Sequence, residues 1–277
     1  MTKGASSRAL PDSLVLAGAG KMGGAMLQGW LAAGLPDGAA LVLDPAPSDE
    51  IRALAAAGRV RLEARDGEAA PEVLVLATKP QSLDEAAPML GAHAGEGTLV
   101  VSILAGKTIA DLSRALPEAR AFIRAMPNLP ASIGRGATGA YANAETTASQ
   151  REIADRLLAC NGIVEWVADE VLIDAVTALS GSGPAYVFHL VEAMAAAGKA
   201  AGLPAELAER LARETVSGAG ALLERSELPA ATLRQNVTSQ GGTTAAALEQ
   251  LMAPDGLTPL LTRAVAAAKR RAGELSG

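Results

Sequence analysis

The stretch LVLAGAGKMGG, residues 14–24, constrains the fold of this chain more than any other. Its first four residues are apolar, as in a buried strand, and residues 24–33 continue with a helix pattern. Between them, the spacing G-x-G-x-x-G is made by Gly18, Gly20 and Gly23. Strand, glycine turn and helix in this order are typical of a dinucleotide site, in which the pyrophosphate lies on the helix N-terminus. The alternative is a glycine-rich turn that binds nothing, and the placement between strand and helix favours the dinucleotide.

Strand and helix patterns alternate as far as residue 168. Unbroken apolar runs predict further strands at 41–43, 73–77, 98–104, 121–124, 137–141 and 163–167, with a shorter one at 60–62. Helical spacing predicts helices at 51–57, 83–90, 108–116 and 148–160, the third capped by Thr108 with Asp111. This alternation predicts an α/β domain, a doubly wound sheet of the Rossmann type, over residues 1–168.

From residue 169 onwards the patterns are helical only. Helices are predicted at 170–179, 185–201, 204–225, 229–237, 245–252 and 258–274. They predict an all-α C-terminal domain over residues 169–277. The helix 185–201 is apolar around nearly its whole circumference, so it needs cover on every side. Either a partner subunit covers it, which predicts a homodimer or higher homo-oligomer, or it is the central helix of a monomeric bundle.

The composition of the 277 residues narrows the classes of partner. The net charge of −6 argues against a nucleic-acid surface, which is normally basic. No apolar run reaches the roughly 18 residues of a membrane helix, and the polar residues 1–13 are expected to be a frayed tail rather than a signal peptide. The single cysteine, Cys160, is typical of a reducing compartment, so a cytoplasmic protein is expected. His93 and His189 are expected to be structural, because neither has a second ligand at metal-binding spacing.

Two residues at strand ends are candidates for cofactor contacts. Asp44 ends the second predicted strand, 21 residues after Gly23, where the fingerprint expects an acid for the ribose hydroxyls. Such an acid would repel a 2′-phosphate and favour NAD over NADP, although Ser48 and Arg52 lie close enough to soften that preference. Lys79 follows the strand 73–77, at the sheet edge where ligands bind. The alternatives are an ordinary loop aspartate and a solvated lysine.

A second glycine-rich break precedes a helix near the C-terminus. It consists of Ser239, Gln240, Gly241, Gly242, Thr243 and Thr244. Free N–H groups and hydroxyls at a helix N-terminus form an anion site, which would suit a substrate carboxylate. A plain helix cap with a glycine turn explains the same pattern, and the residues alone favour that explanation slightly.

Five motifs of this chain, in the same order, resemble those of pyrroline-5-carboxylate reductases. They are Ala77–Pro80 (ATKP), Val101–Gly106 (VSILAG), Arg124–Asn128 (RAMPN), Ser180–Tyr186 (SGSGPAY) and Ser239–Thr244 (SQGGTT), the last followed by Ala247, Leu248 and Leu251. The resemblance extends over nearly the whole chain. Two positions depart from the family pattern: Gln240 stands where the family usually has proline, and Asp44 is not typical of members that prefer NADPH.

The resemblance implies reduction of 1-pyrroline-5-carboxylate to proline by hydride transfer from NADPH or NADH to the C=N carbon. It implies that Thr244 hydrogen-bonds the ring nitrogen through its hydroxyl. The backbone N–H groups of Gly241, Gly242 and Thr243 would hold the carboxylate, with Ser239 assisting and Asn236 supporting the loop. In the family, helices are exchanged between subunits, so that the second glycine loop meets the cofactor domain of the neighbour.

The expected cofactor site combines the fingerprint, the strand ends and the family motifs. Its residues are Gly18, Ala19, Gly20, Lys21, Met22, Gly23, Asp44, Ser48, Ala77, Thr78, Lys79, Pro80, Ile103, Ala105, Gly106, Met126, Pro127 and Asn128. No metal site is expected.

Two other functions remain compatible with parts of the sequence. One is another small-substrate reductase of the same two-domain plan, such as a β-hydroxyacid dehydrogenase or another imine reductase. Such a dehydrogenase would need a lysine and asparagine pair on the long helix, and Lys199 has no asparagine four residues later. The other is a non-catalytic dinucleotide-binding regulator, which would have no need for Ser239–Thr244.

Overall fold

The computed structural model describes residues 10–65 and 67–276, which divide into two compact units. The first unit comprises residues 10–181 and 269–276, and the second comprises residues 182–268. Most of the predicted tail, residues 1–13, lies outside the described residues. Residues 10–13 are not frayed as predicted, because Pro11 is buried and the Ser13 Oγ accepts a hydrogen bond from the Glu72 N–H at 3.0 Å. The domain boundary after residue 168 stays a prediction.

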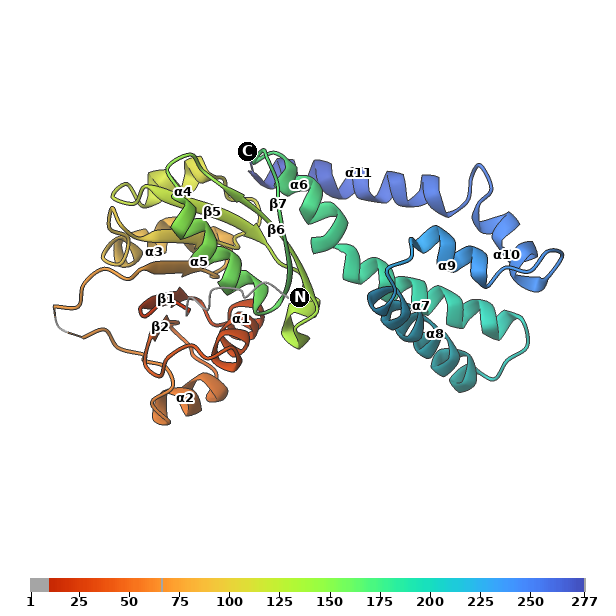
Figure 1. Ribbon diagram of the computed structural model, residues 1–277, viewed down its shortest axis with the longest axis horizontal. Coiled ribbons are helices and arrows are strands. Elements are labelled where there is room, and N and C mark those ends of the chain that lie inside the picture. The colour runs from red at the N-terminus through yellow and green to blue at the C-terminus, as the bar shows by residue number, and fades with distance from the viewer. Residues whose placement is uncertain (1–9, 66, 277) are drawn as a thin grey trace, which may run out of the picture. The chain divides into compact units, whose positions relative to one another are not determined.

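A seven-stranded sheet forms the centre of the first unit (Figure 1). Its strands, in the order β2-β1-β3-β4-β5-β6-β7, are β2 (Ala40–Leu43), β1 (Leu14–Ala17), β3 (Val73–Leu76), β4 (Leu99–Ser102), β5 (Ala121–Met126), β6 (Gly136–Ala142) and β7 (Gly162–Trp166). All neighbours are parallel except β5 and β6. The predicted doubly wound α/β sheet is therefore confirmed.

Helices cover both faces of this sheet. They are α1 (Lys21–Ala32), α2 (Asp49–Ala56), α3 (Leu83–Gly91), α4 (Ile109–Ala115), α5 (Ala148–Ala159) and α6 (Leu172–Val176). Successive side chains of a strand point to opposite faces. Accordingly, Leu14 and Leu16 pack in one core with α1, α2 and α5, whereas Val15 and Ala17 pack in a second core with α3 and α4.

Both tryptophans lie in this first unit, in different surroundings. Trp30 of α1 is fully buried, and its Nε1 donates a hydrogen bond to the Leu157 carbonyl oxygen at 2.8 Å. Trp166, on the edge strand β7, is only partly buried. Its Nε1 donates to the Asp155 Oδ1 at 2.8 Å, and the Arg151 guanidinium lies 4.3 Å from its ring centroid.

Two predicted elements differ from the structure. Residues 60–62 form no strand, only a single parallel bridge between Arg61 and Leu41, because this short segment has β2 as its one neighbour at the sheet edge. The predicted helix 170–179 is also interrupted. Its α-helical part, α6, is followed by a π-helical turn over Thr177–Gly181, in which Thr177 and Ser180 hydroxyls donate to carbonyls four residues earlier.

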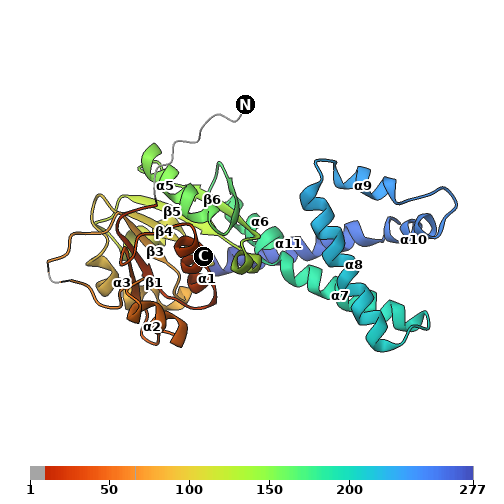
Figure 2. The ribbon, with the colours of Figure 1, turned by 60° about the horizontal axis from the view of Figure 1, so that its bottom comes forward.

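The second unit is entirely helical, which confirms the predicted all-α part. It contains α7 (Gly183–Ala200), α8 (Ala205–Arg225), α9 (Ala230–Asn236), α10 (Thr243–Leu251) and most of α11 (Leu257–Ser276), whose last residues belong to the first unit. The helices α7 and α8 pack side by side (Figures 1 and 2). Phe188 of α7 is nevertheless 56% exposed, so α7 is not the central helix of a monomeric bundle.

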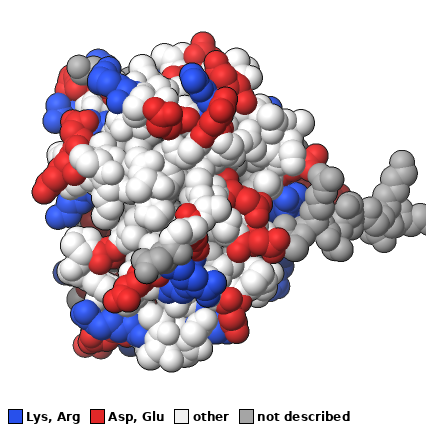
Figure 3. All heavy atoms as spheres, turned by 90° about the vertical axis from the view of Figure 1, so that its left-hand side faces the viewer, with Lys and Arg blue, Asp and Glu red and all other residues white. Residues whose placement is uncertain are grey.

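The described part of the chain has a surface of mixed charge and helices unsuited to a membrane. On the face drawn in Figure 3, acidic and basic side chains are interspersed. Each described helix is too short or too polar to span a lipid bilayer.

Candidate functional site

The glycine turn between β1 and α1 is formed by close approach of the backbone to itself. Gly18 has a φ of +90°, which L side chains rarely adopt, and a Cβ there would lie 2.7 Å from the Ala77 carbonyl oxygen. A Cβ at Gly23 would overlap the Gly18 carbonyl oxygen. At Gly20, in contrast, no described atom from outside the turn's own adjoining residues lies within 4 Å of the position of a Cβ. A group from outside the chain therefore has room to approach the backbone at Gly20.

The N-terminus of α1 is open to an anion. Its N-cap is Gly20, no side chain caps it, and its first turn carries no acidic residue. The helix start therefore presents unpaired N–H groups and the positive end of the helix dipole. Ala19, Lys21 and Met22 lie at this start, as the fingerprint predicts.

Asp44 follows β2 and is fixed beside the glycine turn. Its Oδ2 accepts the Ala19 N–H at 2.8 Å and its Oδ1 accepts the Ala46 N–H at 2.9 Å. Both oxygens keep further lone pairs for a ligand. Ser48 instead caps α2, because its Oγ accepts the Ile51 N–H at 3.3 Å. Its own O–H remains able to donate.

The residues after β3 lie at the carboxyl edge of the sheet, next to Gly18. The order of the strands reverses here, between β1 and β3, which is where open α/β sheets bind ligands. The buried Thr78 Oγ1 has no hydrogen-bond partner among the described residues. Because buried hydroxyls normally have a partner, this one has an unfilled capacity that a polar ligand would satisfy. Lys79 is exposed, and Pro80 begins a short 3₁₀ turn. Together with the open α1 N-terminus, these residues fit a bound dinucleotide.

The loop after β4, residues 103–108, lies at the same edge. Its Leu104 N–H donates to the Ser102 Oγ at 3.2 Å. At Gly106, a Cβ would lie 2.7 Å from the Leu275 carbonyl oxygen, so the end of α11 packs on this loop. This contact was not predicted, because nothing in the local sequence pattern links residue 275 to this loop.

Among the residues after β5, Asn128 uses its side-chain amide for structural contacts. The Asn128 Nδ2 donates to the Ser180 carbonyl oxygen at 3.0 Å, and its Oδ1 accepts the Ala137 N–H at 2.9 Å. The amide thus joins two backbone segments. A cofactor contact by Met126, Pro127 or Asn128 stays a prediction.

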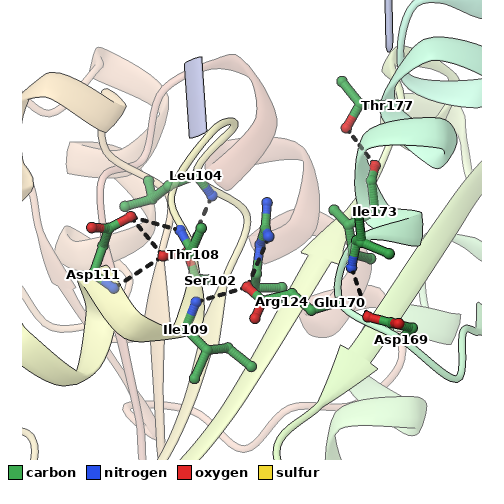
Figure 4. A network of polar contacts seen from close by, with 11 residues as sticks. Ser102, Leu104, Thr108, Ile109, Asp111, Arg124, Asp169, Glu170, Ile173 and Thr177 are labelled. Atoms are coloured by element: carbon green, nitrogen blue, oxygen red, sulfur yellow. Dashed lines mark hydrogen bonds and ion pairs between the residues drawn. The ribbon is translucent and has the colours of Figure 1, made fainter. Parts of the chain in front are cut away.

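A polar network that was not predicted from the sequence surrounds Arg124 (Figure 4). The side chain of Arg124 in β5 is only 6% exposed, and its Nη1 lies 2.8 Å from the Glu170 Oε1. The same oxygen accepts the N–H of Ile109, the first residue of α4, at 2.8 Å (Figure 4). One signal for this network was present, an arginine inside the otherwise apolar run Ala121–Met126.

Beside this network, Thr108 and Asp111 form the predicted capping box at the start of α4 (Figure 4). Burial tends to raise the pKa of Asp111. Hydrogen bonds from Thr108 and the nearby Arg114 outweigh it, so the pKa lies below its ordinary value.

The second glycine-rich loop joins α9 to α10. Gly242 is the N-cap of α10 with no side-chain cap, and Thr243 and Thr244 are its first helical residues. The Gly242 N–H donates to the Ser239 carbonyl oxygen at 3.1 Å, which closes the turn. Thr244 is half-buried, while Asn236 at the end of α9 is exposed. The start of α10 therefore presents free N–H groups and hydroxyls that suit a carboxylate.

The predicted residues fall into two sets. The cofactor candidates lie in the first unit, at the carboxyl edge of the sheet, and the loop Ser239–Thr244 lies in the second. Each set is assembled within its own unit.

Two family models match the chain. The model described as pyrroline-5-carboxylate reductase dimerisation matches residues 170–275, and the model described as NADP oxidoreductase coenzyme F420-dependent matches residues 13–106. The first begins within two residues of the predicted start of the helical part.

Relatives match over nearly the full length. A pyrroline-5-carboxylate reductase of Pseudomonas aeruginosa is 41% identical over 263 residues, which cover 94% of this chain and 95% of the relative. The structure of a pyrroline-5-carboxylate reductase from Coxiella burnetii has a TM-score of 0.88 at 34% identity, covering 96% of this chain and 99% of the other. A pyrroline carboxylate reductase from Plasmodium falciparum, solved with NADP bound, has a TM-score of 0.78 and covers 98% of this chain and 100% of the other. At 24% identity that third match shows the fold alone. This chain belongs to the pyrroline-5-carboxylate reductase family.

Proposed function

We propose that this chain reduces 1-pyrroline-5-carboxylate to L-proline, with NADPH or NADH as the reductant. The observation that carries the proposal is the 41% identity to the Pseudomonas aeruginosa reductase over 94% of the chain. The comparisons favour neither a β-hydroxyacid dehydrogenase nor a non-catalytic regulator. When bound, the dinucleotide supplies hydride from its nicotinamide C4 to the C=N carbon of the ring.

The dinucleotide site proposed here is the set of first-unit residues named from the sequence. The open N-terminus of α1 at Gly20, with Ala19, Lys21 and Met22, would bind the pyrophosphate. The unpartnered hydroxyl of Thr78 would donate or accept one further hydrogen bond. The loops Ala77–Pro80 and Ile103–Gly106, with Met126–Asn128, would hold the nicotinamide half.

The proposed substrate site is the start of α10. The backbone N–H groups of Gly241, Gly242 and Thr243 would hold the substrate carboxylate, with Ser239 assisting and Asn236 supporting the loop. The Thr244 hydroxyl would hydrogen-bond the ring nitrogen. Since an iminium accepts hydride more readily than a neutral imine, a partner that stabilises the protonated nitrogen favours the reaction.

The two sites are proposed to meet across a subunit interface. The dimerisation-family match and the exposed apolar side chains of the second unit, such as Phe188, support a homodimer or higher homo-oligomer. The second glycine loop of one subunit would then serve the dinucleotide domain of its neighbour. The proposed division is a dinucleotide domain over residues 1–168 and a helical domain over residues 169–277. A cytoplasmic location is part of the same proposal.

The direct test follows nicotinamide absorbance with pyrroline-5-carboxylate added. Thr244→Ala should lower kcat by about tenfold to a hundredfold, because it removes one hydrogen bond to the charged ring nitrogen, and should leave the Kd of the dinucleotide unchanged. Thr244→Ser, which restores the hydroxyl, should recover most of the loss. Equal kcat in wild type and Thr244→Ala excludes the role given to this hydroxyl, and no turnover with either dinucleotide excludes the function.

The same assay tests Asp44. A carboxylate held beside the ribose position should disfavour a 2′-phosphate, so kcat/KM should be higher with NADH than with NADPH. Asp44→Asn should shift that ratio towards NADPH by about tenfold, while Glu145→Gln, at an exposed position between β6 and α5, should leave it unchanged. A strong NADPH preference in the wild type contradicts this role for Asp44.

A further inference from the structure

We propose that Arg124 and Glu170 are positioning residues that hold the loop 103–108 in place for the dinucleotide. The inference rests on the proposed function, which assigns part of this loop to the nicotinamide half. It concerns two residues outside the predicted site, which reach the loop through α4.

The first observation is the burial of the Arg124 charge. Its side chain is 6% exposed within the sheet, and a buried guanidinium needs a counter-charge. Glu170 supplies it from the segment before α6, with 2.8 Å between Nη1 and Oε1 (Figure 4). Because the guanidinium is fixed in β5, the Glu170 carboxylate is fixed as well.

The second observation is that the same carboxylate holds the start of α4. Its Oε1 accepts the Ile109 N–H at 2.8 Å. Ile109 directly follows the loop 103–108, so this bond anchors the end of the loop. The beginning of the loop is anchored by the neighbouring strands, through the Ile103 N–H to the Leu76 carbonyl oxygen at 3.0 Å and the Leu104 N–H to the Ser102 Oγ. Ser102 is also the register partner of Arg124.

The third observation is that β5 and the residues after it hold both ends of the segment 170–180. Arg124 holds its beginning at Glu170, and Asn128 holds its end at the Ser180 carbonyl oxygen. This double attachment keeps Glu170 from following movements of the loop. The carboxylate is therefore a fixed reference point for the loop rather than a mobile partner.

Helix capping alone does not explain the contact. The capping box of Thr108 and Asp111 satisfies the N–H groups of these two residues and leaves that of Ile109, for which water could serve as acceptor. A carboxylate at this N–H stabilises the helix start through the dipole, whichever element supplies it. Because this one comes from a residue 61 positions later, it also fixes the position at which the loop ends.

The sharpest test breaks the contact between the Ile109 N–H and the Glu170 Oε1, which are 2.8 Å apart, with a residue whose ring replaces the N–H and so displaces the carboxylate from the start of α4. Ile109→Pro does this, since proline is tolerated at the first helical position and Thr108 already has the extended backbone that a following proline requires, with φ −84° and ψ 164°. Ile109→Ala is the matched control, because it loses the side chain but keeps the N–H. Relative to this control, Ile109→Pro should raise the Kd of NADPH, measured by calorimetry, about fivefold. The KM of pyrroline-5-carboxylate at saturating NADPH should change by less than about twofold.

A second pair of variants tests Glu170 itself. Glu170→Ala should also raise the Kd of NADPH, and Glu170→Gln, which keeps an oxygen to accept the Ile109 N–H, should recover much of the affinity. Equal Kd values for Ile109→Pro and Ile109→Ala overturn the inference, even if Glu170→Ala fails to fold. The Kd is measured without turnover. A wild type that binds NADPH but does not reduce the imine therefore refutes the proposed function, while the Kd comparison still tests the positioning role of Arg124 and Glu170.

Discussion

The two units of this chain bury their apolar side chains to very different extents. The sheet unit has two large cores, one on each face, built from strands β1–β6 and the helices packed on them. In the helical unit the buried apolar side chains are three alanines, Ala195, Ala208 and Ala212. Several of its larger apolar side chains, among them Phe188, Leu222 and Leu223, are about half exposed.

The difference indicates that the stability of the two units has different sources. The sheet unit gains most of its hydrophobic stabilisation within one chain. The helical unit leaves many large apolar side chains exposed, which is typical of an interface, so its stability should depend on a partner and hence on protein concentration. The dimerisation-family match over residues 170–275 agrees with this conclusion.

The largest effect should come from placing a charge on the exposed apolar surface of α7. Phe188→Asp should weaken association by at least about 2 kcal/mol, because it buries an unpaired carboxylate in the interface, and turnover should fall with it. Light scattering at several concentrations measures the association. Met89→Asp is the matched control, since Met89 is similarly exposed, at 50%, but lies on α3 of the sheet unit. If Phe188→Asp assembles as Met89→Asp does, the contrast between the units is wrong.

A core substitution in the sheet unit should lower its free energy of unfolding strongly, and by the same amount at every protein concentration. Trp30→Ala removes a fully buried ring and its hydrogen bond to Leu157, so it should lower the free energy of unfolding of this unit by about 3–5 kcal/mol. Trp166→Phe at the sheet edge should cost less than about 1 kcal/mol. Urea denaturation at two protein concentrations measures both. A concentration-dependent midpoint for the sheet unit would show that it, too, relies on a partner.

The smallest effect should be on the stability of the sheet unit at acidic pH, and it comes from a single ion pair. A side-chain hydrogen bond from Arg61, 2.6 Å between Nη2 and Oε1, lowers the pKa of Glu68 from 4.5 to about 2. Because the folded pKa is the lower one, this pair stabilises the fold above pH 4.5, and its contribution is lost as the pH falls towards 2. Glu68→Gln should therefore reduce stability at neutral pH but flatten its decline in this acid range. Thermal melts across that range measure the slope, and equal slopes in both proteins contradict the assignment.

Most of the fold was predictable, because its signals are local. Apolar runs located the seven strands, and Thr108 with Asp111 located the start of α4. The segment 60–62 was overpredicted, since an apolar pattern does not reveal that a segment has only one neighbour. The π-helical turn at Thr177–Gly181 was missed, because its helical spacing continues that of α6 and α7.

The candidate site was predictable where the residues of one short motif determine the local backbone conformation. The glycine turn is such a case, since Gly18 and Gly23 are required by contacts within the turn and with β3. The Arg124–Glu170 contact joins residues far apart in the sequence, and the Gly106–Leu275 contact depends on where α11 ends. No periodicity encodes such distant pairings. The roles of the individual site residues stay predictions.

The placement of both tryptophans in the sheet unit provides a natural optical distinction between the two units. Trp30 and Trp166 emit from the sheet unit alone, whereas far-ultraviolet circular dichroism is dominated by helices and includes α7–α10. If the helical unit loosens on dilution, the dichroism changes while the emission does not. Tryptophan fluorescence of the unmodified protein thus reports on the sheet unit alone.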